Sequence, residues 1–403
     1  MNNKKILIGI SGGIAAYKIC ELVRLFIKTG NEVRVMMTPS ATKIVSPLTL
    51  SVLSKNDVMI NIFSDTKDFS ESDVVSAGTY HIDYSMWADI CVIAPATANT
   101  LAKINCGIAD NFLTATTLAA RCKVILSPTM DEDMFRNTAT VQNIESLRKK
   151  GFYILEPSIG ELASGIIGEG KMPEPTDIYE YTDYVLTEKD LKGKSILITA
   201  GATRENIDPV RFISNYSTGK MGFELARACS YRGADVTLIS ANSDLKTPYG
   251  VKRIDVNSSD DMSEAVKKNL KNKNLIIMAA AVSDFKPRHI ASEKIKKDKG
   301  KSIILSELVK TTDILKYLGE NKKGYKLIGF ALETNDEEKN ALEKLKKKNA
   351  DMIVMNNPRE EGAGFGTDTN AVTIYSKKGN QRIDKCSKFE VSNKILDYYL
   401  SLR

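Results

Sequence analysis

The sequence contains few residues of the kinds that build metal or disulfide frameworks. Its 403 residues include six cysteines, two histidines and one tryptophan. No cysteines form a C-x-x-C pair or follow the spacing of a metal-ligand set, so we expect neither a disulfide framework nor a zinc site. Most of the cysteines lie in apolar segments, where a reduced thiol packs as a small hydrophobic group.

Long hydrophobic runs are also absent. No apolar stretch approaches the ~20 residues that cross a bilayer. The first predicted strand begins by residue 5, which leaves no room for a secretory signal. With 42% hydrophobic and 27% charged residues, the composition is that of a globular protein long enough for two domains, and we expect it in the cytoplasm.

Basic residues are in excess, and the formal net charge is +7. Lysines concentrate in residues 294–301 and 344–348. These runs contain no interleaved aromatic residues, and the sequence contains no nucleic-acid reader motif. We therefore expect anionic small molecules as partners, and neither nucleic acid nor a membrane.

Predicted strands and helices alternate along both halves, which is typical of mainly parallel sheets wrapped by helices. Strands are predicted at 6–10, 32–37, 90–94, 124–126 and 153–155, and then at 235–240, 275–280, 326–330 and 351–355. A late hairpin is predicted over 371–384, followed by a helix over 388–402. Because the composition becomes charged near residue 188, we predict two α/β, Rossmann-like domains, 1–188 and 189–403.

Two predicted strands run into glycine-bearing loops, at Ser11–Ile14 and Gly201–Arg204. Small residues after a strand let backbone N–H groups approach a phosphate closely. Neither loop has a Walker A sequence or a complete G-x-G-x-x-G motif, and a tight βα turn that needs glycine is the alternative. The stretch 160–175, rich in Gly and Pro, has no periodicity and is predicted to be a functional loop or flap.

Polar candidates follow the predicted strands of the first half. Pro95–Thr100 combines small residues with hydroxyl groups and an amide, which suits close contact with a polar heteroaromatic ring. His81 is a candidate acid or base, although a hydrogen-bonded structural histidine is an alternative.

Five motifs in order make the first half specific: Gly9–Lys18, Thr38–Ala41, Tyr80–Asp83, Pro95–Thr100 and Pro128–Met134. Together they resemble the flavin-dependent cysteine decarboxylases that accept phosphopantothenoylcysteine, over residues 1–185. The resemblance implies a flavodoxin-like domain that binds FMN, catalytic roles for His81, Asp131 and Ser164, and a trimer with flavin between subunits. It implies FMN contacts from Ser11, Gly12, Gly13, Ile14 and Ser40 near the phosphate, and from Pro95, Ala96, Thr97, Ala98 and Asn99 near the ring.

Two positions depart from the pattern of that family. Asp131 stands where members commonly have an Asn that contacts the substrate carboxylate, and an ionised Asp131 would repel that group. Ser164 stands where many members have a cysteine that donates a proton when the enethiol is reduced, and a hydroxyl is a far weaker acid than a thiol of pKa about 8.5. We expect decarboxylation to persist, with Ser164 relaying a proton or holding the product.

The second half carries groups suited to phosphorylated ligands. Residues 204–222 form a polar stretch before a helix predicted near Gly219, and Asp284 follows an apolar strand as a candidate magnesium ligand. Lys294–Lys297 come ten residues later, and Lys344 and Lys348 share a helix face at i, i+4 spacing. A solvated loop and ordinary basic surfaces are the alternatives.

Five further motifs occur in order: Asp208–Gly222, Ala279–Asp284, Lys294–Lys297, Gly329–Thr334 and Lys348–Asp351. They resemble phosphopantothenate–cysteine ligases across residues 190–403, so the whole chain resembles the bifunctional enzymes of coenzyme A biosynthesis. The resemblance implies 4'-phosphopantothenate, L-cysteine and CTP as substrates and an acyl-cytidylate as the intermediate. It implies that Asn215 and Lys294 are catalytic and that Mg²⁺ binds at Asp284. It also implies a dimer, which together with the trimer would build a larger assembly such as a dodecamer. It implies nucleotide contacts from Met278, Ala279, Ala280, Asp284, Lys294, Thr312, Asp313, Ile314, Leu315, Phe330, Lys344 and Lys348.

Two alternative functions come from other classes. A flavin-binding regulatory protein that has lost decarboxylation is favoured by Asp131 and Ser164 and disfavoured by the ligase-like half. An NAD(P)-dependent reductase is favoured by the α/β alternation and the glycine loops. It is disfavoured by the incomplete glycine motif and the lysine cluster.

Overall fold

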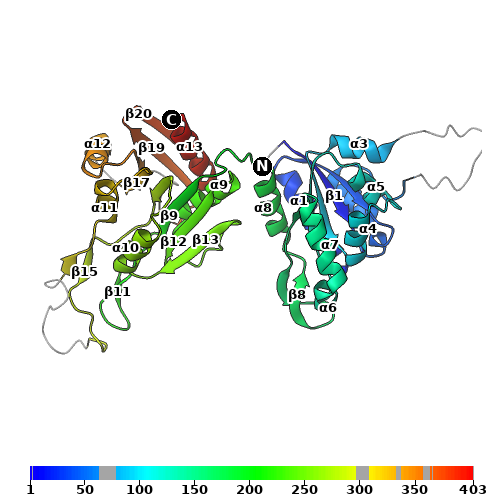
Figure 1. The fold of residues 1–403 in the computed structure, drawn as a ribbon, viewed down its shortest axis with the longest axis horizontal. Coiled ribbons are helices and arrows are strands. Elements are labelled where there is room, and N and C mark those ends of the chain that lie inside the picture. Colours follow the sequence, from blue (N-terminus) through cyan, green and yellow to red (C-terminus); the bar gives the residue numbers. More distant parts are fainter. Residues whose placement is uncertain are drawn as a thin grey trace, which may run out of the picture. The chain divides into compact units, whose positions relative to one another are not determined.

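The computed structural model describes residues 1, 3–62, 79–295, 308–332, 337–356, 364 and 366–402. The chain divides into two compact units, Met1–Leu186 and Thr187–Arg403, which we call unit 1 and unit 2. Each unit is an α/β structure with one central sheet between layers of helices, as Figure 1 shows for each in turn. The predicted fold class is therefore confirmed.

Unit 1 is built on six parallel strands in the order β3-β2-β1-β4-β5-β6. Strands β1 and β4 are almost entirely buried, which explains why they are continuous apolar runs without alternation. The strands are β1 (Lys5–Ile10), β2 (Glu32–Met37), β3 (Val58–Met59), β4 (Ile90–Ala96), β5 (Lys123–Pro128) and β6 (Tyr153–Ile154). The strand order reverses between β1 and β4, and ligands bind outside the carboxyl ends of the strands at such a point.

The helices of unit 1 cover both faces of this sheet. In α1 (Ile19–Lys28) the buried positions Ile19, Leu22, Val23 and Phe26 follow the helical period. A 3₁₀ turn, η1 (Ile14–Lys18), precedes α1. The other elements are η2 (Ala41–Lys43), α2 (Pro47–Ser54), α3 (Tyr80–Trp87), α4 (Ala98–Cys106), α5 (Phe112–Leu118), α6 (Glu132–Arg136), α7 (Thr138–Lys149) and α8 (Pro175–Leu186).

The predicted flap is an antiparallel hairpin of two strands, β7 (Ser158–Glu161) and β8 (Ile167–Lys171). The sequence analysis missed these strands because they contain glycine in place of an alternating apolar face. Gly170 has φ +135°, and a Cβ there would lie 2.2 Å from the Met130 carbonyl oxygen. Glycine at this position therefore lets the hairpin pack against the segment that follows β5.

Unit 2 has an eight-stranded sheet in the order β13-β12-β9-β14-β17-β18-β19-β20. Its first six strands pair in parallel, and the last two pairs are antiparallel. The strands are β9 (Ser195–Gly201), β12 (Asp235–Ala241), β13 (Val251–Val256), β14 (Leu275–Met278), β17 (Lys326–Leu332), β18 (Met352–Asn356), β19 (Thr369–Ser376) and β20 (Gly379–Ser387). The predicted hairpin is β19–β20, whereas β13 was not predicted.

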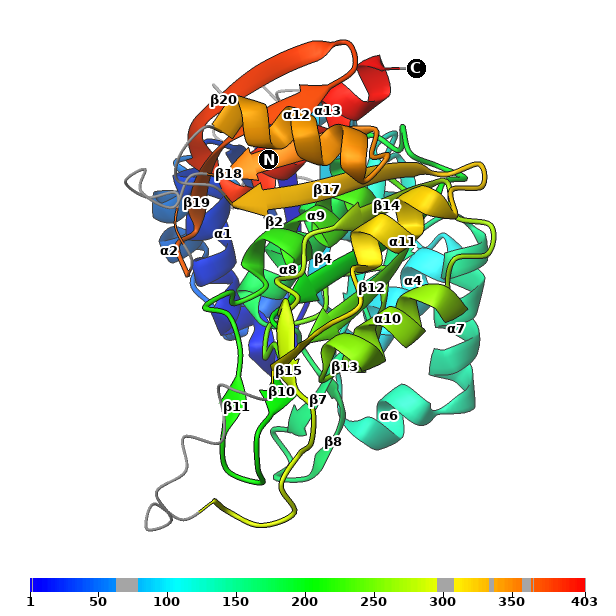
Figure 2. The same cartoon turned by 90° about the vertical axis from the view of Figure 1, so that its left-hand side faces the viewer.

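The two faces of this sheet carry different helices. α9 (Lys220–Tyr231) and α13 (Lys388–Ser401) pack on one face, and α10 (Ser259–Lys268), α11 (Ile314–Glu320) and α12 (Glu337–Lys347) pack on the other. Two short ladders, β10 (Glu205–Asn206) with β11 (Phe212–Ile213) and β15 (Phe285–Pro287) with β16 (Leu308–Lys310), lie at one edge, where Figure 2 shows β10 beside β15. In the part of the chain that is described, no helix is both long and apolar enough to cross a membrane.

The contact between α9 and β9 gives a stability prediction. A Cβ added to Gly222 would lie 2.5 Å from the Ala200 Cβ and 3.0 Å from the Thr199 carbonyl oxygen. We expect Gly222→Ala to destabilise unit 2, because overpacking costs about 1–3 kcal/mol and exceeds the helix-propensity gain of up to about 1 kcal/mol. Urea unfolding followed by circular dichroism measures this change. Gly364→Ala, where nothing lies within 4 Å, is the matched control and should leave stability unchanged.

Candidate functional site

A pocket of about 580 Å³ lies in unit 1 at the carboxyl ends of β1, β4 and β5. It is lined by the loop after β1, the start of α4, the segment after β5, and the β7–β8 hairpin. The lining residues include the predicted site residues Gly12, Gly13, Ile14, Thr97, Ala98, Asp131 and Ser164. The volume is in the range of cofactor sites, which suits the flavin expected here.

The loop after β1 is fixed by contacts with the ends of β2 and β4. Ser11 is buried, and its hydroxyl donates to the Pro95 carbonyl oxygen at 2.7 Å and accepts from the Thr97 N–H at 3.0 Å. A Cβ added to Gly12 would lie 2.6 Å from the Ser40 Cβ, so only glycine allows the two loops to approach this closely. The structure thus gathers the predicted flavin residues at one edge, although Ser11, Ser40, Pro95, Ala96 and Asn99 lie outside the pocket lining.

Asp131 and Ser164, the two departures from the family pattern, contact each other. The Ser164 hydroxyl donates to Asp131 Oδ2 at 2.5 Å, a length typical of a charge-assisted O–H···O⁻ bond. Asp131 also caps α6, because its Oδ1 accepts from the Asp133 N–H. The hairpin is tied to the same segment by the bond from the Met130 N–H to the Gly170 carbonyl oxygen at 3.1 Å. The sequence analysis treated the two positions separately, and only the fold brings them together.

His81 does not line this pocket. It lies in the first turn of α3, where Tyr84 packs edge-on against Phe112 of α5 with ring centroids 5.4 Å apart. Within one chain the pocket that holds Asp131 and Ser164 therefore has no imidazole among its lining residues.

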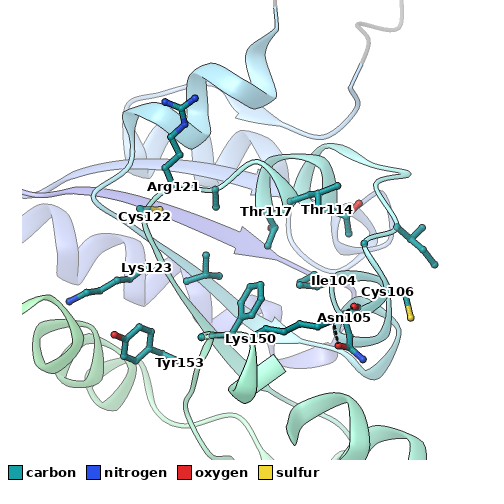
Figure 3. A pocket seen from close by; sticks show the side chains of 17 residues that line it. Ile104, Asn105, Cys106, Thr114, Thr117, Arg121, Cys122, Lys123, Lys150 and Tyr153 are labelled. Atoms are coloured by element: carbon teal, nitrogen blue, oxygen red, sulfur yellow. Dashed lines mark hydrogen bonds between the residues drawn. The ribbon is translucent and has the colours of Figure 1, made fainter. Parts of the chain in front are cut away.

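A second pocket in unit 1, of about 630 Å³, contains none of the predicted residues. Figure 3 shows it where α4, α5 and α7 end and where β5 and β6 begin, at the opposite edge of the sheet from the flavin-site residues. The Lys150 ammonium donates to the Asn105 carbonyl oxygen at 2.5 Å and to its Oδ1 at 2.8 Å. Lys150 therefore caps the C-terminal end of α4, and its ammonium is already hydrogen-bonded within the protein.

Unit 2 has a pocket of about 490 Å³ beyond the carboxyl ends of β14 and β17. It contains ten of the twelve predicted nucleotide residues, which are Met278, Ala280, Asp284, Thr312, Asp313, Ile314, Leu315, Phe330, Lys344 and Lys348. Ala279 and Lys294 are not in the lining. Five lining residues were not predicted as nucleotide contacts: Val282 and Ser283, which lie inside the Ala279–Asp284 motif, Phe285, which follows it, and Lys310 and Thr311, which precede the predicted Thr312.

Asp313 contacts both a helix N-terminus and a lysine of this pocket. Its carboxylate caps α11 by accepting from the Lys316 N–H at 2.9 Å, and it forms an ion pair with Lys348. Burial acts to raise the pKa of Asp313, but the hydrogen bonds from Lys348 and the Lys316 N–H outweigh it and hold the pKa below its usual range. The Lys344 ammonium donates to the Phe330 carbonyl oxygen at 3.3 Å. Two lysines are thus held at the mouth of a pocket that also contains Asp284.

No group of three or more His, Cys, Asp or Glu side chains among the described residues could hold a metal ion. Asp284 is exposed at the pocket, and its backbone is fixed by the bond from the Thr311 N–H to its carbonyl oxygen at 3.0 Å. A divalent cation at Asp284 would therefore need most of its ligands from phosphate oxygens and water, which is the usual arrangement for Mg²⁺ with nucleotides.

Asn215 and Lys294 lie on separate segments, and neither is in the lining of this pocket. Asn215 Nδ2 donates to the Ala281 carbonyl oxygen at 3.3 Å, and the Ser214 hydroxyl donates to the Thr203 carbonyl oxygen at 2.7 Å. Lys294 is exposed at the end of the segment after β15, and the neighbouring Lys296 and Lys297 of its motif lie outside the described residues.

The second glycine loop is separated from its helix by the polar stretch that begins at Arg204, and the helix begins close to Gly219, as predicted from the sequence. Strand β9 ends at Gly201, and α9 begins only at Lys220, after β10 and β11. Gly219, with φ +84°, returns the chain so that a Cβ there would lie 3.1 Å from the Gly201 nitrogen. The start of α9 therefore lies beside the glycine loop at the end of β9, because the segment between them folds back.

The close approach of Gly12 to Ser40 gives a prediction for flavin binding. We expect Gly12→Ala to reduce the flavin retained by the purified protein at least about tenfold, because the added methyl group separates the loops that surround the expected phosphate. The ratio of absorbance at about 450 nm to protein measures retention. The unfolding midpoint of the flavin-free protein is the control, and unchanged flavin content would contradict the assignment of this loop.

Two family models cover the chain. Residues 1–187 match the family described as Flavoprotein, and residues 191–402 match the DNA/pantothenate metabolism flavoprotein C-terminal domain. A solved structure of the C-terminal domain of a coenzyme A biosynthesis bifunctional protein CoaBC is 41% identical. It covers 53% of this chain and 98% of its own, with a TM-score of 0.46.

Relatives match over most or all of the chain. The coenzyme A biosynthesis bifunctional protein CoaBC of Bacillus subtilis is 44% identical over 407 residues, covering 100% of this chain and 98% of its own. A cysteine/cysteine sulfinic acid decarboxylase from an unknown prokaryotic organism is 43% identical, covering 89% of this chain and 99% of its own. The chain belongs to the family of coenzyme A biosynthesis bifunctional proteins.

Proposed function

We propose that the chain catalyses two consecutive reactions of coenzyme A biosynthesis. Residues 189–403 ligate L-cysteine to 4'-phosphopantothenate with CTP, and residues 1–188 decarboxylate the resulting phosphopantothenoylcysteine to 4'-phosphopantetheine with FMN. The full-length similarity to CoaBC of Bacillus subtilis carries this proposal. The pocket that gathers ten predicted nucleotide residues supports it. The location is cytoplasmic, where CTP is available.

Ligation requires activation, because a free carboxylate is a poor electrophile. The carboxylate of 4'-phosphopantothenate attacks the α-phosphorus of CTP and releases pyrophosphate, which forms an acyl-cytidylate. The amine of cysteine then attacks the acyl carbon, and CMP leaves. Asn215 and Lys294 serve this chemistry, while Lys344 and Lys348 offset the charge on the phosphates together with Mg²⁺ at Asp284.

Decarboxylation needs an electron sink, since loss of CO₂ next to an amide nitrogen otherwise leaves an unstabilised carbanion. The loops around Gly12 and Ser40 and the Pro95–Asn99 segment fit an FMN phosphate and ring at the carboxyl edge of the sheet. FMN held there would supply reversible two-electron redox chemistry: oxidation of the cysteinyl thiol to a thioaldehyde, which is the electron sink, and later reduction of the enethiol that loss of CO₂ leaves. Two groups of the chain handle protons. His81 acts as the base, and the Ser164 hydroxyl, which donates a hydrogen bond to Asp131, holds a proton at the pocket.

A second copy of the chain completes this site. His81 does not line the pocket that contains Asp131 and Ser164, although the reaction needs all three. We therefore include a homo-oligomer in the proposal, with trimers formed through unit 1 and dimers through unit 2. Trimeric and dimeric contacts together generate a closed assembly such as a dodecamer.

Mass-resolved product analysis tests the proposed function. With 4'-phosphopantothenate, cysteine, CTP and Mg²⁺, we expect CMP, CO₂ and 4'-phosphopantetheine. CMP with phosphopantothenoylcysteine or its oxidised enethiol, and no 4'-phosphopantetheine, would support the alternative of an active ligase joined to an impaired flavin half. Decarboxylation of free cysteine without CMP formation would overturn the proposal.

Removing the metal separates the two reactions. We expect excess EDTA to lower CMP formation at least about 100-fold, because without Mg²⁺ Lys344 and Lys348 would be left to offset the charge of the triphosphate, and the Asp284 carboxylate would repel it. Decarboxylation of supplied phosphopantothenoylcysteine should be unchanged within the error of the same assay. Mg²⁺ returned in excess should restore ligation, and metal-independent ligation would remove Asp284 from its proposed role.

Mixed oligomers test the shared active site. His81→Asn and Ser164→Ala should each lower decarboxylation at least about 100-fold. Co-expression of the two variants should then restore about a quarter of the activity, because random mixing places an intact His81 against an intact Ser164 in that fraction of sites. No recovery in verified mixed oligomers would mean that both groups act from one chain. Ligation by unit 2 is the internal control.

A further inference from the structure

A buried carboxylate in unit 2, Asp208, has no role in the site described above. Its residue is 2% exposed, and its side chain accepts five hydrogen bonds. Oδ1 accepts from the N–H groups of Val210 and Arg211 at 2.8 Å each. Oδ2 accepts from Arg211 Nε at 2.9 Å, from Arg211 Nη2 at 2.5 Å and from the Ile295 N–H at 3.2 Å. The hydrogen bonds from Arg211 hold the pKa of Asp208 well below its usual range, so it is ionised.

The two oxygens of this carboxylate serve two separate segments. Oδ1 closes the turn Asp208–Arg211, in which Pro209 occupies the position that favours proline. That turn leads into β11 and from there to Ser214 and Asn215. Besides its bonds from Arg211, Oδ2 accepts a hydrogen bond from the N–H of Ile295, which lies 87 residues further along the chain and next to Lys294.

The segment that carries Lys294 depends on this connection. Lys294 is exposed, and its ammonium forms no hydrogen bond or ion pair with the described residues. Three bonds fix the backbone around it: Ala291 N–H to the Ile207 carbonyl oxygen at 3.0 Å, Ile295 N–H to Asp208 Oδ2, and Arg211 Nη2 to the Ile295 carbonyl oxygen at 3.0 Å. All three partners come from the β10–β11 connection.

We propose that Asp208 is a positioning residue for the ligase reaction, which sets Lys294 and Asn215 in one geometry through Arg211 and the Ile295 backbone. The inference rests on the proposed function, because it assumes that Lys294 and Asn215 act in one reaction. It assigns no contact between Asp208 and substrate. The buried Asp208 carboxylate, paired with the half-exposed Arg211 guanidinium, instead links two distant segments of the chain.

Asp208→Asn tests this role with minimal change of shape. The asparagine carbonyl oxygen can replace Oδ1 and keep the turn. Its amide nitrogen then faces the Arg211 and Ile295 N–H donors in place of Oδ2, so the link to the Lys294 segment is lost. The matched control is Asp190→Asn, which breaks the other two-point Asp–Arg pair of unit 2, with Arg232 Nε at 2.9 Å and Nη2 at 2.5 Å.

The measurements are acyl-cytidylate formation without cysteine, CMP release with cysteine, and the unfolding midpoint, all on the full chain with flavin bound. We expect Asp208→Asn to lower kcat about 100-fold while KM for CTP changes less than about threefold, because displacement of a reacting group by 1 Å costs about that much. Asp190→Asn should retain kcat within about twofold. Decarboxylation by unit 1 should be unchanged in both variants.

A second comparison separates positioning from a general structural role. If Asp208 acts through Lys294, then Asp208→Asn combined with Lys294→Gln should be no slower than Lys294→Gln alone. Multiplying losses would overturn the proposal, and so would equal kcat values for Asp208→Asn and Asp190→Asn. Should Asp208→Asn fail to fold, Arg211→Lys, which keeps the charge pair but loses the bridge to the Ile295 carbonyl oxygen, carries the same expectation. A wild-type chain that forms no CMP would instead contradict the proposed function itself.

Discussion

Both candidate sites depend on backbone segments that approach each other more closely than a side chain allows. A Cβ at Gly12 would lie 2.6 Å from the Ser40 Cβ, and a Cβ at Gly201 would lie 1.9 Å from the Ala241 carbonyl oxygen. Parallel strands end at one edge of a sheet, so their loops must share a small space. Glycine at these positions lets the neighbouring loops lie this close together at the edge.

The first site shows how a fold couples residues that look independent in sequence. Asp131 caps a short helix, and Ser164 lies at the tip of a hairpin that Gly170 allows to pack beneath Met130. Their bond of 2.5 Å replaces the amide and thiol expected from the family pattern with a carboxylate and a hydroxyl that satisfy each other. The fold thus makes the two departures from the family pattern direct hydrogen-bond partners.

The fold class was predictable because buried parallel strands are continuous apolar runs, as in β4 and β14. The hairpin β7–β8 was not, because its residues have neither apolar alternation nor strand propensity, and its position depends on Gly170 and Met130. Ten of the twelve predicted nucleotide residues line one pocket, because the carboxyl ends of β14 and β17, the start of α11 and the end of α12 meet there. Asp208 gave no signal of its contact with Ile295, since a bond across 87 residues exists only in the folded chain.

The charges around the first pocket bear on how a substrate carboxylate is held. Asp131 and Glu161 line it, as do Lys18 and Lys171. A carboxylate 4 Å from an ionised Asp131 would meet a repulsion of about 4 kcal/mol near a protein surface. Lys18 is already paired with Glu174 at 2.8 Å. Lys171 lies on β8, the strand that follows the Ser164 turn, so the hairpin that brings a hydroxyl to Asp131 also brings an ammonium to the pocket. The hairpin therefore supplies both the Ser164 hydroxyl and the Lys171 ammonium to the lining of this pocket.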